Sequence, residues 1–486
     1  QTTAGTVTLN NLSTAQGNAI TVLNSVTTLE AVLADTAAAT DSVTVTIDDG
    51  DATAAAITVG DITAASVETL NIVTGDTAAI THVVSDLDGS TSVRTLNVSG
   101  TANLTITNAT AMAAGATVNA SSYAANLTVG IGAGDTVLGG SGNENVTLAF
   151  ASLGNTTKVD GGAGDNTMTI SGDGSDVVDG DFALITEVDN IVLSSTTDTS
   201  VTMAGFAQGA IATTNNADGM LDISAVALTT GGTIDASAMI LAGVDATVTS
   251  TNVDAAGATT IALTGSAVND RFIVTANDTA DADNNDNLLT TVTPGNGIDV
   301  IEFTGTAVDV ADVLTVVTTA TTGANADIIS GFTGNSAGTV IDYNGTVQGT
   351  IDTDVTANAT LAGAVAADAT ASAWVVTTDV VNSGTNTQGS ALNDVLNSTA
   401  ATLTANYAIL EAELLATGGT LSGTVTGLDA AAGAAEAALI VVDNGTGSVI
   451  MRLTNTTATG NTIEAGELEL VGVITDATGL VAADFI

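Results

Sequence analysis

The sequence predicts an all-β protein: a parallel β-helix, or β-solenoid, followed by a smaller C-terminal α+β cap. Two observations predict this fold. Short phrases with alternating apolar residues recur along the first half of the chain, and Gly, Asn, Asp or Ser bound them. Apolar residues make up 45% of the chain but aromatic residues only 2%, so the core must consist mainly of Val, Ile, Leu, Ala and Thr. Such side chains fit the narrow interior of stacked coils.

The repeated phrases locate the expected strands. The phrase SVETLNIVTG at 66–75 returns as SVRTLNVSG at 92–100, and ANLTIT (102–107), ATVNAS (116–121) and ANLTVG (125–130) follow. In each phrase apolar residues alternate over four to six positions, which is the pattern of a strand with one buried face. Degenerate repetition of short strands with tight corners is typical of a solenoid.

Helical patterns are few, and most lie near the C-terminus. Residues 402–416 place Leu403, Tyr407, Leu410 and Leu414 on one face at helical spacing. This spacing predicts an amphipathic helix, which distinguishes the last ninety or so residues from the chain before them.

Three further segments have weaker patterns. The Ala-rich stretch 428–443 is a second helix candidate, while 438–453 reads as a hairpin that turns around Asn444 and Gly445. A short helix is also expected within 23–35. Because helix and hairpin signals concentrate after Asn393, we place a domain boundary near that residue.

The charge balance is strongly acidic. The chain has 53 acidic residues and four basic ones, Arg94, Lys158, Arg271 and Arg452, which gives a formal net charge of −49. Nucleic acids and anionic membrane surfaces are excluded as partners, because both require clusters of Lys and Arg. Acids can simply keep a protein soluble, but with so few bases to pair them we expect divalent cations as partners.

The chain lacks the residues that several other classes of function require. The chain has no cysteine, and its single histidine, His82, excludes a zinc site of several His or Cys ligands. No apolar run approaches the roughly 18 residues of a membrane span, so no membrane insertion is expected. The start of the chain lacks a signal-peptide pattern, and Gln1 suggests a trimmed N-terminus. We expect no enzymatic activity.

One phrase carries the chemistry: Gly-Gly-x-Gly-x-Asp-x-apolar-x. Four stretches fit it, at 139–147, 161–169, 171–179 and 294–302. Glu144 replaces the Asp in the first, Asn166 in the second, and Asp176 and Asp299 are in place in the others. Glycines allow a tight turn with inward carbonyls, and the carboxylate adds negative charge, so such turns offer the oxygen ligands that Ca²⁺ prefers.

These turns supply the candidate calcium ligands. The alternative is ordinary Gly/Asp turns without metal, but repeated carboxylates would repel one another without a cation. The candidates are Gly139, Gly140, Gly142, Glu144, Gly161, Gly162, Gly164, Asp165, Asn166, Gly172, Asp173, Gly174, Asp176, Gly295, Asn296, Gly297 and Asp299.

The phrases and their order resemble the RTX-type surface-layer (S-layer) proteins of Gram-negative bacteria. TLNVSGTANLTITNAT, then DTVLGGSGNENVTL, then KVDGGAGDNTMTI follow the order of those proteins, and 326–343 is similar to the phrase that closes RTX arrays. The ending Asp484 to Ile486 resembles an uncleaved type I secretion signal. The resemblance implies RTX-like calcium-binding turns, Ca²⁺ as cofactor, and a location outside the cell, on its surface. The nonapeptides are fewer and more scattered than in RTX toxins.

Four segments follow from these patterns. Residues 1–130 are expected to form an N-terminal solenoid-like segment and 131–200 the calcium-binding turns. Residues 201–392 continue the solenoid, with a second calcium-binding turn near 294–302, and 393–486 form the C-terminal α+β cap with the secretion signal.

The expected function is a calcium-dependent, self-assembling extracellular structural protein, a surface layer or a surface filament. Its expected partners are further copies of itself, divalent cations and a cell-surface polysaccharide. An RTX adhesin that binds a surface or a glycan is the alternative, although no aromatic-rich binding module is evident. A β-helix polysaccharide lyase or hydrolase is the third choice, disfavoured by the scarcity of bases and aromatic residues.

Overall fold

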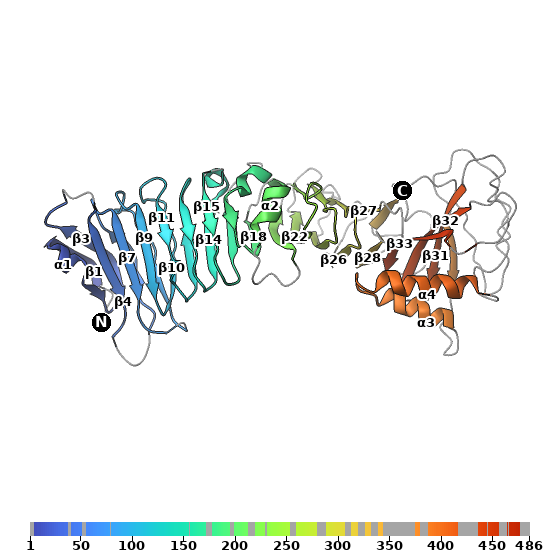
Figure 1. Ribbon diagram of the computed structural model, residues 1–486, viewed down its shortest axis with the longest axis horizontal. Helices are drawn as coiled ribbons and strands as arrows, with labels where there is room; N and C mark the ends of the chain where they lie inside the picture. The colour runs from blue at the N-terminus through green and yellow to red at the C-terminus, as the bar shows by residue number, and fades with distance from the viewer. Residues whose placement is uncertain are drawn as a thin grey trace. The chain divides into compact units, whose positions relative to one another are not determined.

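A computed structural model shows two compact units, Gln1–Val226 and Ala227–Ile486, which are described here one at a time (Figure 1). The structure describes residues 4–36, 40–50, 55–77, 79–154, 156–171, 177–194, 199–211, 219–228, 231–252, 259–278, 288–306, 313–318, 326–331, 339–343, 375–379, 387–416, 436–444, 446–455, 464 and 466–476.

The first unit is a β-solenoid in which the chain alternates between two parallel sheets. One sheet contains β2 (Ile20–Val22), β4 (Ser42–Ile47), β7 (Thr69–Thr74), β9 (Thr95–Gly100), β11 (Thr117–Asn119), β13 (Thr136–Leu138), β15 (Lys158–Asp160) and β17 (Ile185–Thr186). The facing strands are β1 (Ala4–Leu12), β3 (Val26–Leu33), β5 (Thr58–Val59), β6 (Ile62–Thr63), β8 (Thr81–Val84), β10 (Asn103–Ile106), β12 (Leu127–Gly130), β14 (Glu144–Ala149), β16 (Thr167–Ser171), β18 (Asn190–Ser194) and β20 (Leu221–Leu228). The corners carry four short helical segments, α1 (Thr14–Gly17), η1 (Phe150–Ser152), η2 (Asp179–Phe182) and α2 (Gly205–Ala210). Strand β19 (Thr199–Thr202) precedes α2 and belongs to a third sheet.

The core of this unit is a stack of aliphatic side chains, one from each coil. Leu70 pairs with Leu96, Leu96 with Val118, Val118 with Val137, and Val137 with Val159. All five are buried, and their strand neighbours face outward, so burial alternates along each strand. Small and β-branched side chains fill this thin interior, which explains why the chain needs so few aromatic residues.

The second unit continues the same architecture and adds an α+β region. Its parallel solenoid strands are β21 (Gly231–Asp235), β22 (Val244–Asn252), β23 (Thr259–Thr264), β24 (Arg271–Asp278), β25 (Leu288–Thr293), β26 (Val300–Thr306), β27 (Val313–Thr318), β28 (Asp327–Ser330) and β29 (Thr339–Tyr343). The later elements are β30 (Val375–Asp379), α3 (Thr387–Leu396), α4 (Leu403–Leu415), β31 (Glu436–Asp443), β32 (Ser448–Asn455) and β33 (Leu468–Ile474).

The α+β region closes the end of this solenoid. Strand β33 pairs in parallel with β28 and antiparallel with β32, so it joins the region to the coils. Ile298 and Ile328 of the solenoid share one hydrophobic cluster with Leu392 of α3 and Leu410 of α4. The predicted fold class, a parallel β-solenoid with a small C-terminal α+β region, is therefore confirmed.

The helix and hairpin predictions have mixed outcomes. The helix expected at 402–416 is confirmed as α4, with Leu403, Tyr407, Leu410 and Leu414 buried. The hairpin is confirmed as β31 and β32, which pair antiparallel from Asp443 and Ser448 outward. The Ala-rich helix prediction is wrong for 436–443, which form β31, because that segment pairs on both sides within a sheet; residues 428–435 lie outside the described part of the chain.

The short helix expected within 23–35 is also wrong. Residues 26–33 form β3, in which Leu29, Ala31 and Leu33 are buried at every second position while β1 pairs alongside. A period of two and a strand partner outweigh the local helix propensity of Leu, Glu and Ala. Asn393 lies inside α3, and the four expected segments stay predictions.

We expect truncation of the core stack to destabilise the first unit. Replacement Leu96→Ala removes a fully buried side chain between two coils and should lower the free energy of unfolding by about 2–5 kcal/mol. Thermal unfolding followed by circular dichroism measures the change. Leu23→Ala, at a side chain that is 51% exposed, is the control and should leave the midpoint nearly unchanged. Equal effects of the two substitutions would argue against a continuous stack.

Candidate cation-binding turns

The first two predicted turns lie next to each other in the first unit. Residues 139–144 lead into β14 and residues 161–166 into β16, and these two strands pair in parallel. Leu127 on β12 pairs with Glu144, so Glu144 occupies an inward position that is apolar one coil earlier. By the same register Asn166 and Asp189 follow Glu144 in successive coils. We call Glu144, Asn166 and Asp189 the first acid column.

The glycines of these turns are required by the close stacking of the backbone. A Cβ atom on Gly162 would lie 2.4 Å from the Gly140 carbonyl oxygen, and one on Gly164 would lie 2.0 Å from the Gly142 carbonyl oxygen. Gly164 also has φ +127°, a conformation that residues with side chains rarely adopt. The repeated glycines thus let one turn sit directly on the next.

Backbone amides hold one oxygen of each side chain in the first acid column. The Glu144 N–H donates to Asn166 Oδ1 (3.0 Å), and the Asn166 N–H donates to Asp189 Oδ2 (2.6 Å). The Gly140 N–H donates to Glu144 Oε1 (3.1 Å). In the described part of the chain the other oxygens, Glu144 Oε2 and Asp189 Oδ1, are buried and have no hydrogen-bond partner. Each acid therefore keeps one buried oxygen available to a proton or a cation.

Burial makes these carboxylates costly to ionise. Desolvation raises the pKa of Glu144 to about 7, against a smaller lowering by the Gly140 N–H. Burial also raises the pKa of Asp189, and the negative charges of Asp165 and Glu187 raise it further. At neutral pH the column must take up protons, carry an unfavourable charge, or bind a cation.

A second acid column lies in the second unit. Asp270, Asp299 and Asp327 occupy the positions at the start of β24, β26 and β28, which pair in order, and all three are at most 3% exposed. The Asp270 N–H donates to Asp299 Oδ1 (2.7 Å), and the Val244 N–H donates to Asp270 Oδ1 (2.7 Å). The preceding glycines, Gly295 and Gly297, both have positive φ.

The two carboxyls at the end of this second column contact each other. Burial, and then the negative charge of Asp327, raises the pKa of Asp299. Burial also raises the pKa of Asp327, and that of Asp270 to about 6. Asp299 Oδ2 and Asp327 Oδ1 are buried without a hydrogen-bond partner among the described residues. Two contacting carboxyls with free oxygens must share a proton or a cation.

The chemistry of both columns fits a hard divalent cation such as Ca²⁺. The free oxygens belong to carboxylates, a ligand type that Ca²⁺ takes in proteins. The chain offers no thiolate, and His82 lies outside both columns. In the first unit Glu144 and Asp189 each offer one such oxygen, on either side of Asn166, and in the second unit Asp299 and Asp327 offer theirs in adjacent coils.

The structure separates the predicted ligands into three groups. Gly139, Gly140, Gly142, Glu144, Gly161, Gly162, Gly164 and Asn166 form one stack, while Gly295, Gly297 and Asp299 belong to the second unit. Asp165 and Asn296 are exposed. Each lies in its turn ahead of the buried residue that begins the inward face, Asn166 and Ile298 respectively. Gly172, Asp173, Gly174 and Asp176 lie outside the described part of the chain, as do Trp374 and the ending at 484–486.

Sequence reasoning missed Asp189, Asp270 and Asp327. None of them follows a Gly-Gly-x-Gly phrase, so a search for that phrase passes over them. They share a weaker sequence signal, an Asp at the start of a short apolar strand or directly before it. Examples are DRFIV at 270–274 and DIIS at 327–330.

A matched pair of glycine substitutions tests the stacking of the turns. Gly164→Ala should destabilise the first unit by at least about 1–3 kcal/mol, from its positive φ alone, and the contact with the Gly142 carbonyl adds to this. Gly154→Ala introduces a methyl group with no atom within 4 Å and should be nearly neutral. Urea unfolding of both variants gives the comparison. A neutral Gly164→Ala would show that the turns do not stack this closely.

The acid columns predict an unusual pH dependence when a chelator removes divalent cations. Since the pKa of Glu144 is raised on folding, its contribution to stability is complete below its unfolded pKa of about 4.3 and is lost as the pH rises through about 7. The melting temperature should therefore fall between pH 5 and pH 8, and Glu144→Gln should reduce this fall. Asp165→Asn removes an exposed charge from the neighbouring turn, 161–166, and is the control. If the fall were the same in Glu144→Gln and in Asp165→Asn, general charge repulsion would explain it instead.

Comparisons with known proteins do not assign the chain to a family. No protein-family model matches it, no curated protein matches it, and no solved structure matches it. The structure and the chemistry of the two acid columns therefore carry the functional argument, and the resemblance to RTX-type proteins remains an expectation from the sequence.

Proposed function

We propose that this protein is a calcium-dependent, self-assembling structural protein outside the cell, forming a surface layer or a surface filament. The two acid columns carry the proposal. Among the described residues, buried carboxyl oxygens without hydrogen-bond partners occur at Glu144 and Asp189, two coils apart in the first unit, and at Asp299 and Asp327, in adjacent coils of the second. A β-solenoid would gain rigidity from cations at this position, because each cation replaces repulsion between coils with attraction.

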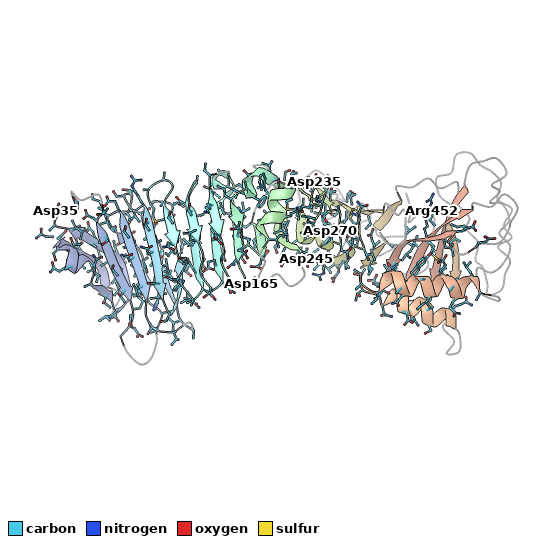
Figure 2. All side chains as sticks on the ribbon, viewed as in Figure 1. Asp35, Asp165, Asp235, Asp245, Asp270 and Arg452 are labelled. Atoms are coloured by element: carbon cyan, nitrogen blue, oxygen red, sulfur yellow. The ribbon has the colours of Figure 1, made fainter. Side chains whose placement is uncertain are left out.

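The charge of the whole chain supports dependence on cations during assembly. Each copy has a formal net charge of −49, so neighbouring copies repel one another at separations shorter than the Debye length of the solution. Among the described residues, Arg271 and Arg452 form ion pairs with carboxylates, at 3.0 Å to Asp245 and 3.2 Å to Glu469. Figure 2 shows the acidic side chains along the coils. Divalent cations are the natural means of bringing such copies together.

An exposed strand supports association between copies. Strand β1 pairs with β3 along one edge, and no strand of the described part of the chain pairs with its other edge. Its sequence, AGTVTLNNL, contains neither charge nor proline, the usual features that prevent pairing with another chain. A second strand could add to this edge through backbone hydrogen bonds.

The burial of His82 favours a structural function of the protein over a catalytic one. The side chain is fully buried and faces the core from β8, where Leu104 is its partner in the next coil. A general base must reach its substrate, and a fully buried imidazole does not. A chain whose single histidine is enclosed in this way offers no Ser-His-Asp triad at that residue.

Stabilisation by calcium tests the first part of the proposal. At pH 8, millimolar Ca²⁺ should raise the melting temperature of the chelator-treated protein, because extracellular calcium sites have dissociation constants of about 10⁻⁴ to 10⁻³ M. Asp299→Asn should lose part of this rise. Glu302→Gln, three residues away and 43% exposed, should keep it. An identical rise in all three proteins would remove the second acid column from the proposal.

Electron microscopy tests assembly. Purified protein should form ordered sheets or fibres with Ca²⁺ and disperse with a chelator, and Glu144→Gln combined with Asp299→Asn should shift assembly to higher Ca²⁺. Asp165→Asn combined with Glu302→Gln is the control with the same loss of charge. Monodisperse particles under both conditions would contradict the proposal and favour an adhesin, or an enzyme if anionic polysaccharides were turned over.

A further inference from the structure

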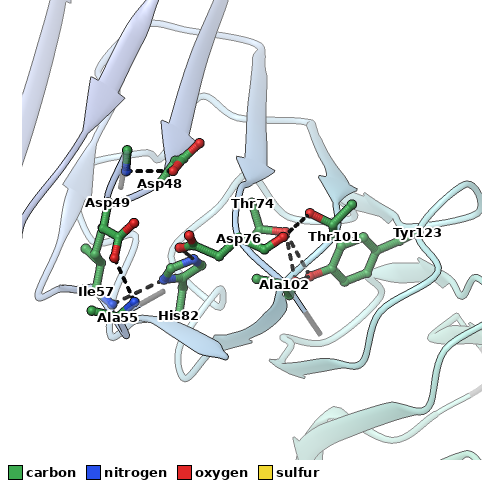
Figure 3. A network of polar contacts seen from close by, with 11 residues as sticks. Asp48, Asp49, Ala55, Ile57, Thr74, Asp76, His82, Thr101, Ala102 and Tyr123 are labelled. Carbon is green, nitrogen blue, oxygen red and sulfur yellow. Dashed lines mark hydrogen bonds and ion pairs between the residues drawn. The ribbon is translucent and has the colours of Figure 1, made fainter. Parts of the chain in front are cut away.

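A third group of acids lies in the first unit, away from both acid columns. Strands β4 and β7 pair in parallel and end together, with Ile47 opposite Thr74. Asp48 and Asp49 directly follow β4, and Asp76 follows β7 after one glycine, so the three carboxylates meet at one corner of two adjacent coils (Figure 3). None of them belongs to a Gly-Gly-x-Gly-x-Asp phrase, and the sequence analysis did not single them out.

The three carboxylates are close enough to share one ion. One oxygen of each lies within 4.8 Å of the others. The Asp76 side chain is only 4% exposed. Acidic groups at a surface corner normally separate into the solvent, so this convergence needs a structural cause.

The backbone around each acid holds the group together. The Gly50 N–H donates to Asp48 Oδ1 (2.8 Å), and the Ala55 N–H donates to Asp49 Oδ2 (2.7 Å). Asp76 has φ +59°, a conformation that costs a non-glycine residue stability, and the Thr101 hydroxyl donates to its carbonyl oxygen (2.7 Å). A Cβ atom on Gly75 would lie 2.4 Å from the Asp48 carboxyl carbon, so only glycine leaves room for that carboxylate.

A fully buried imidazole faces the same group. His82 Nδ1 accepts a hydrogen bond from the Ile57 N–H (3.2 Å), and its Nε2 lies 3.3 Å from Asp76 Oδ2 (Figure 3). Neither Nε2 nor Asp76 Oδ2 has a hydrogen-bond partner of good geometry among the described residues. Since Nδ1 acts as the acceptor, the hydrogen-bond network assigns the ring proton to Nε2.

This tautomer gives His82 a positioning role. With its proton on Nε2 and its Nδ1 lone pair occupied, the neutral ring has no free lone pair for a metal and instead presents an N–H to Asp76. Its close approach, 3.3 Å from Nε2 to Asp76 Oδ2, limits the positions open to that carboxylate, and a neutral ring does not cancel the charge of the group. In the described part of the chain no Lys or Arg forms an ion pair with the three acids. Burial, then the charges of Asp49 and Asp48, raise the pKa of Asp76.

We propose that Asp48, Asp49 and Asp76 form a separate binding site for a hard divalent cation, Ca²⁺ in calcium-rich surroundings, with His82 as the residue that positions Asp76. Three carboxylate oxygens supply the protein ligands, and water completes the coordination on the exposed side. The inference goes beyond the proposed function, because this site is independent of the glycine-rich turns and of assembly.

The single histidine makes the site observable on its own. We would label His and Tyr in the full-length protein and follow their side-chain NMR signals while adding Mn²⁺, a paramagnetic ion that broadens signals near its binding site. The His82 signal should broaden at lower Mn²⁺ than the Tyr407 signal, and excess Ca²⁺ should restore it. Tyr407 of α4 serves as the reference because assembly broadens both kinds of signal, whereas Tyr123 hydrogen-bonds Thr74 close to the three acids.

Substitutions then separate the site from its surroundings. Asp48→Asn should require at least tenfold more Mn²⁺ for the same broadening of His82, and Asp49→Asn gives a second variant if Asp48→Asn alters the His82 signal in chelator. Asp88→Asn removes an exposed acid from another corner and should behave as the unmodified protein. Asp299→Asn should keep the His82 response even where it loses stabilisation by calcium, so the two proposals can fail separately.

The proposal has two clear ways to fail. If the Tyr407 signal broadens before that of His82, the three acids do not bind the ion preferentially. If Asp48→Asn and Asp49→Asn respond as the unmodified protein does, the ion near His82 is held by other groups. Either result would overturn the site.

Discussion

The hydrogen bond from a backbone N–H of one coil to a buried side-chain oxygen of the next is the interaction on which both halves of the solenoid depend. Aliphatic side chains fill most inward positions, and the apolar contacts between them do not require a particular orientation. At the starts of β14, β24 and β26 the inward residue is instead Glu144, Asp270 or Asp299, whose oxygens receive amides from the same or a neighbouring coil. These bonds fix the spacing of the turns, and they leave charged oxygens inside the protein. The same hydrogen bonds that order the turns thus keep carboxyl groups in the interior without a positive charge to pair them.

A bound cation would neutralise the charge of these buried carboxylates. The two acid columns differ in how strongly their carboxylates repel one another. In the first unit Asn166 stands between Glu144 and Asp189, so a neutral amide separates two acids. In the second unit Asp299 and Asp327 contact each other directly. Like charges at contact in a poorly hydrated interior cannot both remain ionised without a counterion or a proton. The second column is therefore the more dependent on what the surrounding solution supplies.

Much of the fold could be predicted from the sequence, because a solenoid repeats its pattern in every coil. The phrases around Leu70, Leu96 and Val118 carried enough periodicity to locate strands, and the glycines at 161–164 located a turn. The hairpin of β31 and β32 was predicted, but the pairing of β3 with β1 and of β31 with β30 was not, because both segments also have helical composition. Nor could the sequence reveal that Asp76 meets Asp48, because register across 28 residues decides it, or that Asp165 faces outward while Asn166 faces inward.

The junction between β28 and β33 has a consequence for growth of the solenoid. On one side β33 continues the parallel ladder of the coils, and on the other it pairs antiparallel with β32. A further coil has no free ladder to extend beyond this strand, and α3 and α4 cover the apolar residues at the same end. The C-terminal region therefore acts as a terminator of coil stacking. At this end of the second unit, another copy of the protein would therefore have to bind through a surface other than the parallel ladder of the coils.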